Sequence, residues 1–124
     1  MKIFIIAGED SGDKLGSAII DSLRVSLDTI PIFVGIGGIG MTRRGVSSIF
    51  PLSELSVMGF TQIASQYNKL RKRLDQTVSA IIDEQPDILL TIDAPEFCFR
   101  VAKKVKFLNK KIPIVHYVAP SVWA

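Results

Sequence analysis

The segment Ile88 to Phe99, read ILLTIDAPEFCF, constrains the fold of this chain more than any other stretch. Its first five residues form an apolar run without alternating polar positions, which is typical of a strand covered on both faces in a parallel sheet. Asp93 and then Pro95 follow, and a helical pattern begins after the proline. Ligands of such sheets bind beyond the carboxyl ends of the strands. Asp93 stands at one of these ends and is therefore the first candidate for a chemical role.

Further apolar runs predict strands on either side of this segment. They cover Lys2 to Ala7, Ile32 to Gly35 and Ile114 to Val118, and Val46 to Pro51 predicts a short outer strand. Strands of this kind alternate with helical patterns along the whole chain. The sequence therefore predicts a doubly wound α/β fold with a parallel sheet and right-handed crossovers.

Three helices are expected between the strands. The first follows the glycine-rich turn after residue 7, with Ser11 as its expected N-cap and Asp13 in its first turn. The second covers Phe60 to Glu84 and is preceded by an expected loop with an apolar tip, Ser53 to Phe60. The third follows Pro95, and its expected inner face holds Phe97, Val101, Val105 and Leu108.

Length and composition indicate one well-packed domain. The chain has 124 residues, of which 48% are hydrophobic, and its formal net charge of +3 is too small to indicate nucleic-acid binding. The basic residues cluster in Lys69 to Arg73 and between Lys103 and Lys111. Each cluster is either a solvated helix face or a surface that attracts anionic lipid or phosphate.

The cysteine and histidine content excludes several kinds of site. The only cysteine, Cys98, lies in an apolar stretch and is expected to be a small buried side chain in a cytoplasmic protein. With one histidine besides, no structural zinc site is expected. No apolar run approaches the roughly 18 to 20 residues that span a bilayer, so any membrane contact is expected to be peripheral.

One motif invites a cofactor assignment that its surroundings do not support. Residues Gly35 to Gly40 match G-x-G-x-x-G letter for letter. A dinucleotide fingerprint needs a long helix after the last glycine and an acid about 20 residues further on. Gly45 is expected to end any helix here after a turn and a half, and no acid lies at the required distance. We therefore expect a sharp backbone turn, and no nicotinamide or flavin cofactor.

Four stretches stand out by their order and spacing. They are AGEDSGD at Ala7 to Asp13, LSVMGF at Leu55 to Phe60, TIDAPEF at Thr91 to Phe97, and HYVAPSVWA at His116 to Ala124. Together they resemble the N-terminal half of the lipid-A-disaccharide synthase family, and the resemblance covers essentially the whole chain. Members of that family have two Rossmann-like domains with the active site between them, the GT-B arrangement. The resemblance implies that residues 1–124 form the acceptor-side domain, a Rossmann-like sheet of about five strands, and that the C-terminal nucleotide-sugar domain is absent.

The resemblance also implies a reaction and its partners. The family transfers 2,3-diacylglucosamine from UDP-2,3-diacylglucosamine to the 6-hydroxyl of 2,3-diacylglucosamine 1-phosphate by an inverting mechanism. The products are the β-1,6 disaccharide of lipid A and UDP. The implied partners are these two substrates, a separate C-terminal half and the surface of the inner membrane. Because the donor site would lie in the absent half, the isolated chain is expected to be inactive.

Asp93 is the expected catalytic base. The resemblance matches it to the essential aspartate of the family, and its position at a strand end agrees with that role. With an ordinary pKa of about 3.9 it is ionised at neutral pH and can accept the proton of an attacking sugar hydroxyl. A second reading makes Asp93 the N-cap of the following helix, with Glu96 three residues later. The two roles are compatible.

The remaining candidate residues are expected to bind substrate. Gly8, Glu9, Ser11, Gly12 and Asp13 either contact sugar hydroxyls or only form the turn. His116 is either a core histidine or a substrate ligand, and Ser121 is a candidate hydrogen-bond donor. Met58 and Gly59 belong to the apolar tip, which either receives acyl chains and touches the bilayer or packs on the core.

Two other functional readings remain. The chain could be a non-catalytic remnant or split-gene product that folds without turning anything over. It could also be a small module of the flavodoxin or response-regulator type. A receiver domain has paired acids after its first strand and a lysine after its last. Glu9 and Asp10 fit in part, but no lysine follows Val118, which disfavours this reading.

Overall fold

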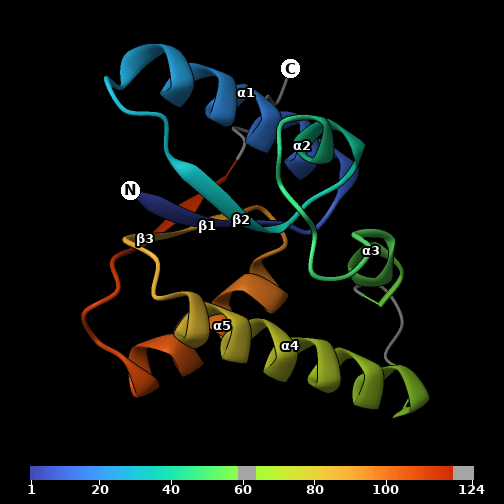
Figure 1. The fold of residues 1–124 in the computed structure, drawn as a ribbon. Helices are drawn as coiled ribbons and strands as arrows, with labels where there is room; N and C mark the ends of the chain where they lie inside the picture. The colour runs from blue at the N-terminus through green and yellow to red at the C-terminus, as the bar shows by residue number, and fades with distance from the viewer. Residues whose placement is uncertain (59–63, 119–124) are drawn as a thin grey trace, which may run out of the picture.

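The computed structural model describes residues 1–58 and 64–118, which form four parallel strands and five helices (Figure 1). The strands are β1 (Lys2–Ala7), β2 (Ile32–Ile36), β3 (Ile88–Ile92) and β4 (Ile114–Tyr117). The helices are α1 (Asp10–Ser26), α2 (Ile39–Arg43), α3 (Ser53–Met58), α4 (Ala64–Glu84) and α5 (Pro95–Leu108). The predicted α/β class with a parallel sheet is confirmed.

The strand order in the sheet is β2-β1-β3-β4, and every neighbouring pair is parallel. The two central strands are the most deeply buried, because the uninterrupted apolar runs leave no polar face for solvent. In β1 the side chains from Phe4 to Ala7 are fully buried, and Ala7 lies in register with Ile92 of β3. The adjacent ends of β1 and β3 therefore meet at one edge of the sheet.

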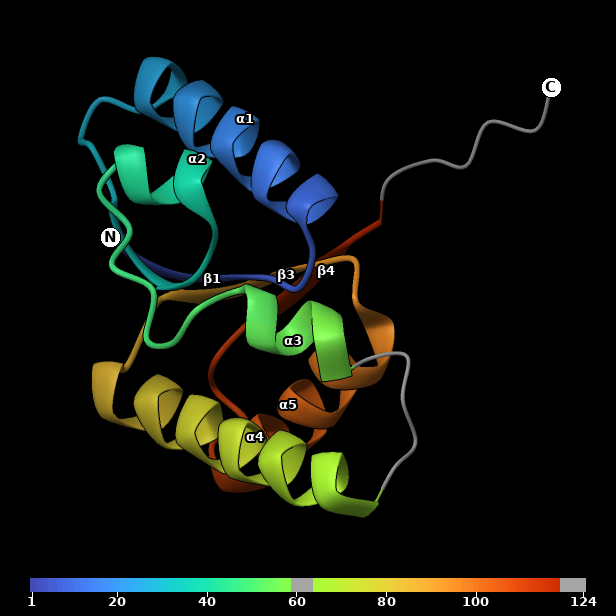
Figure 2. The same ribbon diagram turned by 90° about the vertical axis from the view of Figure 1, so that its right-hand side faces the viewer.

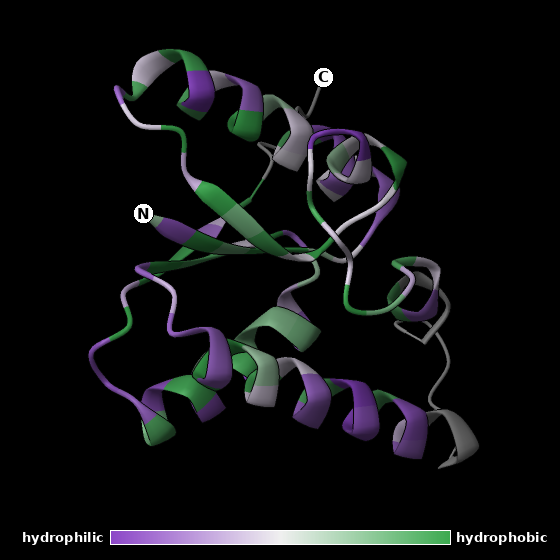
Figure 3. Cartoon of the chain, in the orientation of Figure 1, coloured by the Kyte–Doolittle hydropathy of each residue, from purple (hydrophilic) through white to green (hydrophobic). Residues whose placement is uncertain are grey.

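Helices cover both faces of the sheet, as the doubly wound prediction requires. Figure 2 shows α1 and α2 on one side and α3, α4 and α5 on the other. Figure 3 shows that the strands between these layers are mainly hydrophobic, whereas much of α4 is hydrophilic. The helices pack on the sheet through buried residues that include Ile20, Ile81, Val101 and Val105.

Three predictions about the segments between the strands are corrected. Val46 to Pro51 forms no strand among the described residues but makes one bridge, Gly35 with Ser48, beside the β2 edge. The part of the expected loop from residue 53 to 58 is helix α3, since Leu55 is buried in the core and holds one face of a short helix. The sheet consequently has four described strands where about five were expected.

One boundary prediction and one burial prediction agree with the structure, and one predicted orientation does not. Helix α2 ends after Arg43, and Gly45 follows with φ of +93°, as expected for a glycine that stops a short helix. Cys98 is completely buried, as predicted. Leu108, however, is 60% exposed, because α5 ends at this residue and no further helical turn covers it.

Candidate active-site edge

The ends of β1 and β3 form the point where the sheet changes winding direction. From β1 the chain passes through α1 to β2 on one side, whereas from β3 it passes through α5 to β4 on the other. The crevice at such a switch point is where doubly wound sheets bind ligands. Gly8 follows β1 and Asp93 follows β3, so two of the predicted site residues lie at this end of the sheet.

Asp93 occupies an unusual backbone conformation. Both Asp93 (φ 50°) and Ala94 (φ 40°) are left-handed, a region that costs a non-glycine residue roughly 1–2 kcal/mol. The Asp93 side chain is half-buried, and its backbone N–H donates to the carbonyl oxygen of Tyr117 at 2.9 Å. The turn is therefore tied to the end of β4.

Asp93 is not the N-cap of the helix that follows. The N-cap of α5 is Ala94, with Pro95 at the first helical position, and the Ala94 side chain supplies no capping hydrogen bond. The expected capping box is therefore wrong by one residue. The left-handed turn places Asp93 outside the helix, at the end of β3.

Helix α1, after the turn that follows β1, begins two residues earlier than expected. Glu9 is the N-cap of α1, and its carbonyl oxygen accepts the N–H of Asp13 at 2.9 Å. Ser11 is exposed inside the first turn, where it cannot act as the N-cap. Glu9 is half-buried, whereas Gly8 and Gly12 are buried. Of the predicted binding residues in this turn, Ser11 and Glu9 remain accessible.

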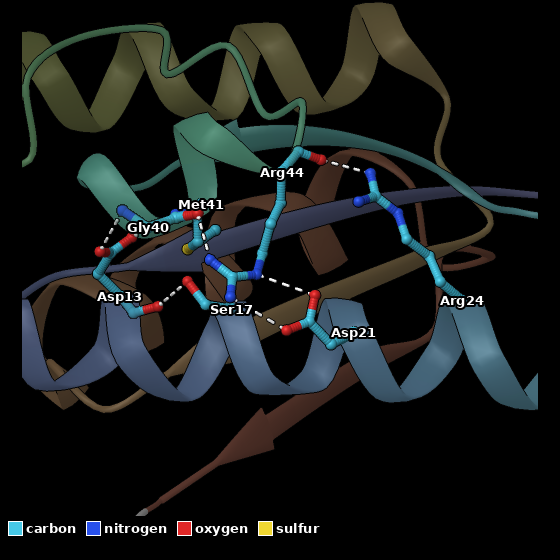
Figure 4. Close-up of polar contacts among 7 residues, drawn as sticks. All are labelled: Asp13, Ser17, Asp21, Arg24, Gly40, Met41 and Arg44. Carbon is cyan, nitrogen blue, oxygen red and sulfur yellow. Dashed lines mark hydrogen bonds and ion pairs between the residues drawn. The ribbon is translucent and has the colours of Figure 1, made fainter.

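Asp13 is committed to a structural role that the sequence did not indicate. Its carboxylate accepts the backbone N–H groups of Gly38 at 2.8 Å, Gly40 at 2.9 Å and Met41 at 3.0 Å. Figure 4 shows the side chain reaching from α1 to the start of α2. These donors are the free N–H groups of a helix N-terminus, which favour a negative charge. The carboxylate thus caps α2 from a neighbouring helix and occupies the place of an anion at the glycine-rich loop.

A second, exposed contact joins the end of α2 to α1. Arg44 donates to both carboxylate oxygens of Asp21, at 2.9 and 3.1 Å, and to the carbonyl oxygen of Gly40 at 2.9 Å (Figure 4). The hydrogen bond from Arg44 lowers the pKa of Asp21, and the same bond raises the pKa of Arg44. The glycine-rich motif therefore serves to pack α2 against α1.

His116 lies beside the candidate edge on β4. Its Nδ1 atom is 2.6 Å from the hydroxyl oxygen of Thr91, the residue beside it in register on β3, and its ring lies 4.8 Å from that of Phe99. Nε2 is buried and has no hydrogen-bond partner in the described part of the chain. Cys98 packs nearby, and burial raises the pKa of its thiol to about 12, so it is no nucleophile at neutral pH.

The remaining predicted residues are only partly placed. Met58 is the last residue of α3. Gly59 and Ser121 lie outside the described residues.

A groove lined by residues of α4 and α5 was not predicted from the sequence. It has a volume of about 910 Å³ and an apolar lining, and basic side chains surround it. The apolar members are Tyr67, Leu70, Leu74, Phe107 and Leu108, and the basic members are Arg71, Arg100, Lys103, Lys104 and Lys106. We call these ten residues the basic groove. The signal for this groove in the sequence was Phe107, an aromatic residue among lysines. Its side chain is 84% exposed in the structure.

Within the described ranges, no helix is both long and apolar enough to cross a bilayer. The same residues contain no cluster of three or more histidine, cysteine, aspartate or glutamate side chains that could hold a metal ion.

Comparison with known proteins gives consistent matches over the whole chain. A family model described as lipid-A-disaccharide synthetase matches residues 3–124. A lipid-A-disaccharide synthase of Rhodospirillum centenum is 43% identical over 98% of the chain, and one of Nitrobacter winogradskyi is 47% identical over 99%. One of Ruegeria pomeroyi is 46% identical over all of it. The chain spans only 30 to 31% of the length of these relatives.

Proposed function

Because the chain belongs to the lipid-A-disaccharide synthase family, we propose that it is the acceptor-side part of a UDP-sugar-dependent glycosyltransferase. In the proposed reaction, 2,3-diacylglucosamine passes from UDP to the 6-hydroxyl of 2,3-diacylglucosamine 1-phosphate. The matched relatives are about three times as long as this chain, so we assign the complete reaction to an assembly that includes the remaining part of such a polypeptide. The observation that carries the proposal is the position of Asp93 at the switch point of the sheet.

Asp93 acts as the general base in this proposal. As the acceptor oxygen bonds to the anomeric carbon of the donor, its proton passes to the Asp93 carboxylate. The bond between the anomeric carbon and the UDP oxygen breaks with inversion, and UDP leaves with the electron pair. A weak carboxylate base suffices because the hydroxyl becomes acidic as it bonds to a carbon with oxocarbenium character.

Neighbouring groups would orient the acceptor. Glu9 and Ser11 border the same sheet edge and can exchange hydrogen bonds with sugar hydroxyls, whereas Asp13 is occupied by three backbone N–H groups. His116 holds β4 against β3 through Thr91 and thereby supports the Tyr117 carbonyl that binds the Asp93 backbone. We therefore assign acceptor contacts to Glu9 and Ser11, and a supporting role to His116.

The test is a glycosyl-transfer assay on the chain alone and on a mixture with the rest of a relative. The complementing polypeptide would be the part of the Ruegeria pomeroyi synthase outside the matched segment. We expect product only in the mixture, and a loss of about 10²- to 10⁴-fold with Asp93→Asn. Asp28→Asn is the matched control, because Asp28 is exposed in the loop between α1 and β2. Equal rates for the two variants would remove Asp93 from the mechanism. Absence of product in every mixture would favour the non-catalytic remnant.

We also propose that the basic groove makes peripheral contact with an anionic membrane surface. Its apolar members accept hydrocarbon, and its cations each contribute about 1 kcal/mol near anionic lipid. Lys104 is partly neutralised by Asp75 at 2.9 Å, so Lys103 and Lys106 are the better test positions. Sedimentation with phosphatidylglycerol vesicles should fall for Lys103→Glu/Lys106→Glu, and phosphatidylcholine vesicles should bind little. Equal binding of both vesicle types would contradict the proposal.

A further inference from the structure

The strained turn at the end of β3 depends on a residue in the turn that follows β1. Two consecutive residues other than glycine, Asp93 and Ala94, have positive φ angles. Such conformations persist only where the surroundings hold them. Two of the contacts are clear: the Asp93 N–H donates to Tyr117, and the Ala94 carbonyl oxygen accepts the N–H of Cys98 at 3.0 Å.

The third contact is with Gly8. A Cβ atom at position 8 would lie 2.3 Å from the Cβ of Ala94, far closer than two carbon atoms that are not bonded to each other can approach. The backbone of Gly8 does not itself require glycine, because its φ is not in the left-handed region. Gly8 is also buried. The Ala94 methyl group occupies the space that a side chain at position 8 would fill.

We infer that Gly8 is a positioning residue for Asp93: the space above it holds the Ala94 methyl and so sets the turn from which the Asp93 carboxylate projects. The inference rests on the proposed role of Asp93 as base. A base displaced by about 1 Å from its productive position can lose as much as 100-fold in rate. The sequence motif that contains Gly8 therefore acts on the motif that contains Asp93, across the β1–β3 boundary.

The coupling can be tested by exchanging the two small residues. Gly8→Ala should displace the turn, whereas Gly8→Ala combined with Ala94→Gly should restore it, because the added methyl then takes the place of the one removed. In the isolated chain, the readouts are the carbon-13 shift of the Asp93 carboxyl and the amide shift of Ala94 or its glycine replacement. We expect the Asp93 carboxyl shift and the amide shift at position 94 to change in Gly8→Ala, and the Asp93 carboxyl shift to return to its wild-type value in the double variant.

The same variants in the complemented transfer assay give the functional readout. Gly8→Ala should lower kcat by 10- to 100-fold with little change in KM, and the double variant should recover to within about threefold of wild type. Urea unfolding of each variant shows whether a loss of rate is only a loss of folded protein. Ala94→Gly alone is the control for increased turn flexibility.

The possible results separate this inference from the proposed function. Unchanged Asp93 spectra in Gly8→Ala, or a folded double variant without recovery, would overturn the positioning role. If the spectra recover in the double variant but Asp93→Asn keeps full turnover, Gly8 and Ala94 do set the shape of the turn. In that case Asp93 is not the base, and the effect of Gly8 on catalysis is overturned as well.

Discussion

Replacing Asp13 tests how strongly the carboxylate from α1 holds the glycine-rich loop. In Asp13→Asn, the oxygen that accepts Gly38 and Met41 can remain, but an NH₂ group then faces the N–H of Gly40. Reversing the amide is worse, because the NH₂ group would then face two donors. The variant loses the charge-assisted hydrogen bond from Gly40 and places its own NH₂ group against the Gly40 N–H. Together these changes should lower the free energy of unfolding by about 2 kcal/mol.

Asp13→Ala should cost more. It leaves all three N–H groups without their acceptor, and the Met41 N–H is buried where water does not easily replace it. We expect a loss of about 3 to 5 kcal/mol, a large part of the 5 to 15 kcal/mol typical of a domain. Substituting Asp21, the exposed partner of Arg44 on the same helix, provides the matched control and should change stability little.

The assay is urea unfolding followed by far-ultraviolet circular dichroism. With a slope near 2 kcal/mol/M, Asp13→Asn should lower the midpoint by about 1 M, without changing the slope. A midpoint for Asp13→Asn that equals that of Asp21→Asn would show that the three hydrogen bonds contribute no special stability.

Two further predictions concern packing and pH. Gly35→Ala should lower the free energy of unfolding by about 4 kcal/mol or more, because the new Cβ would lie 1.9 Å from the carbonyl oxygen of Ile5. Gly45→Ala, whose new Cβ would have its nearest contact at 3.5 Å, should lower it by only about 1–2 kcal/mol. Similar losses for the two variants in urea unfolding would contradict this. Since burial raises the pKa of the Cys98 thiol to about 12 in the folded state against about 8.5 unfolded, the folded state keeps its proton longer. Its contribution to stability should be complete below pH 8.5 and decline as the pH rises towards 12, and the same titration of Cys98→Ala should lack that component.

The elements predicted correctly from sequence are those with a local physical cause. The strand ending at Ile92 has an apolar residue at nearly every position, which only a doubly covered strand accommodates. The short helix before Gly45 ends where a residue with positive φ is required. Such causes act within a few residues and can be read without knowledge of the neighbours in space.

The errors arise where distant contacts decide the outcome. Helix α3 exists because Leu55 packs in the core and Glu54 pairs with Arg73 of α4 at 2.7 Å. The start of α1 at Asp10, with Glu9 as its N-cap, has no cause that we can identify in the structure. Periodicity within either segment does not reveal these outcomes.

The position of the candidate site could be predicted from the sequence, but the different roles of its acidic residues could not. The acid at a strand end indicated Asp93, and the sheet order places it at the switch point. The acids of the first turn looked alike in the sequence, yet Asp13 serves the loop at Gly38, 25 residues away. Only the packing of α2 on α1 distinguishes Asp13 from the exposed Asp10.

The pairing of β1 with β3 has a consequence for synthesis of the chain. Ala7 is made early, but its register partner Ile92 is made only after α1, β2 and α4 have been translated. Contacts so distant in sequence form slowly, because a long loop must close before they contribute. Until then the apolar residues Ile3 to Ala7 of β1 lack their β3 partners, so we expect the growing chain to be prone to aggregation until the strand ends beside Asp93 have assembled.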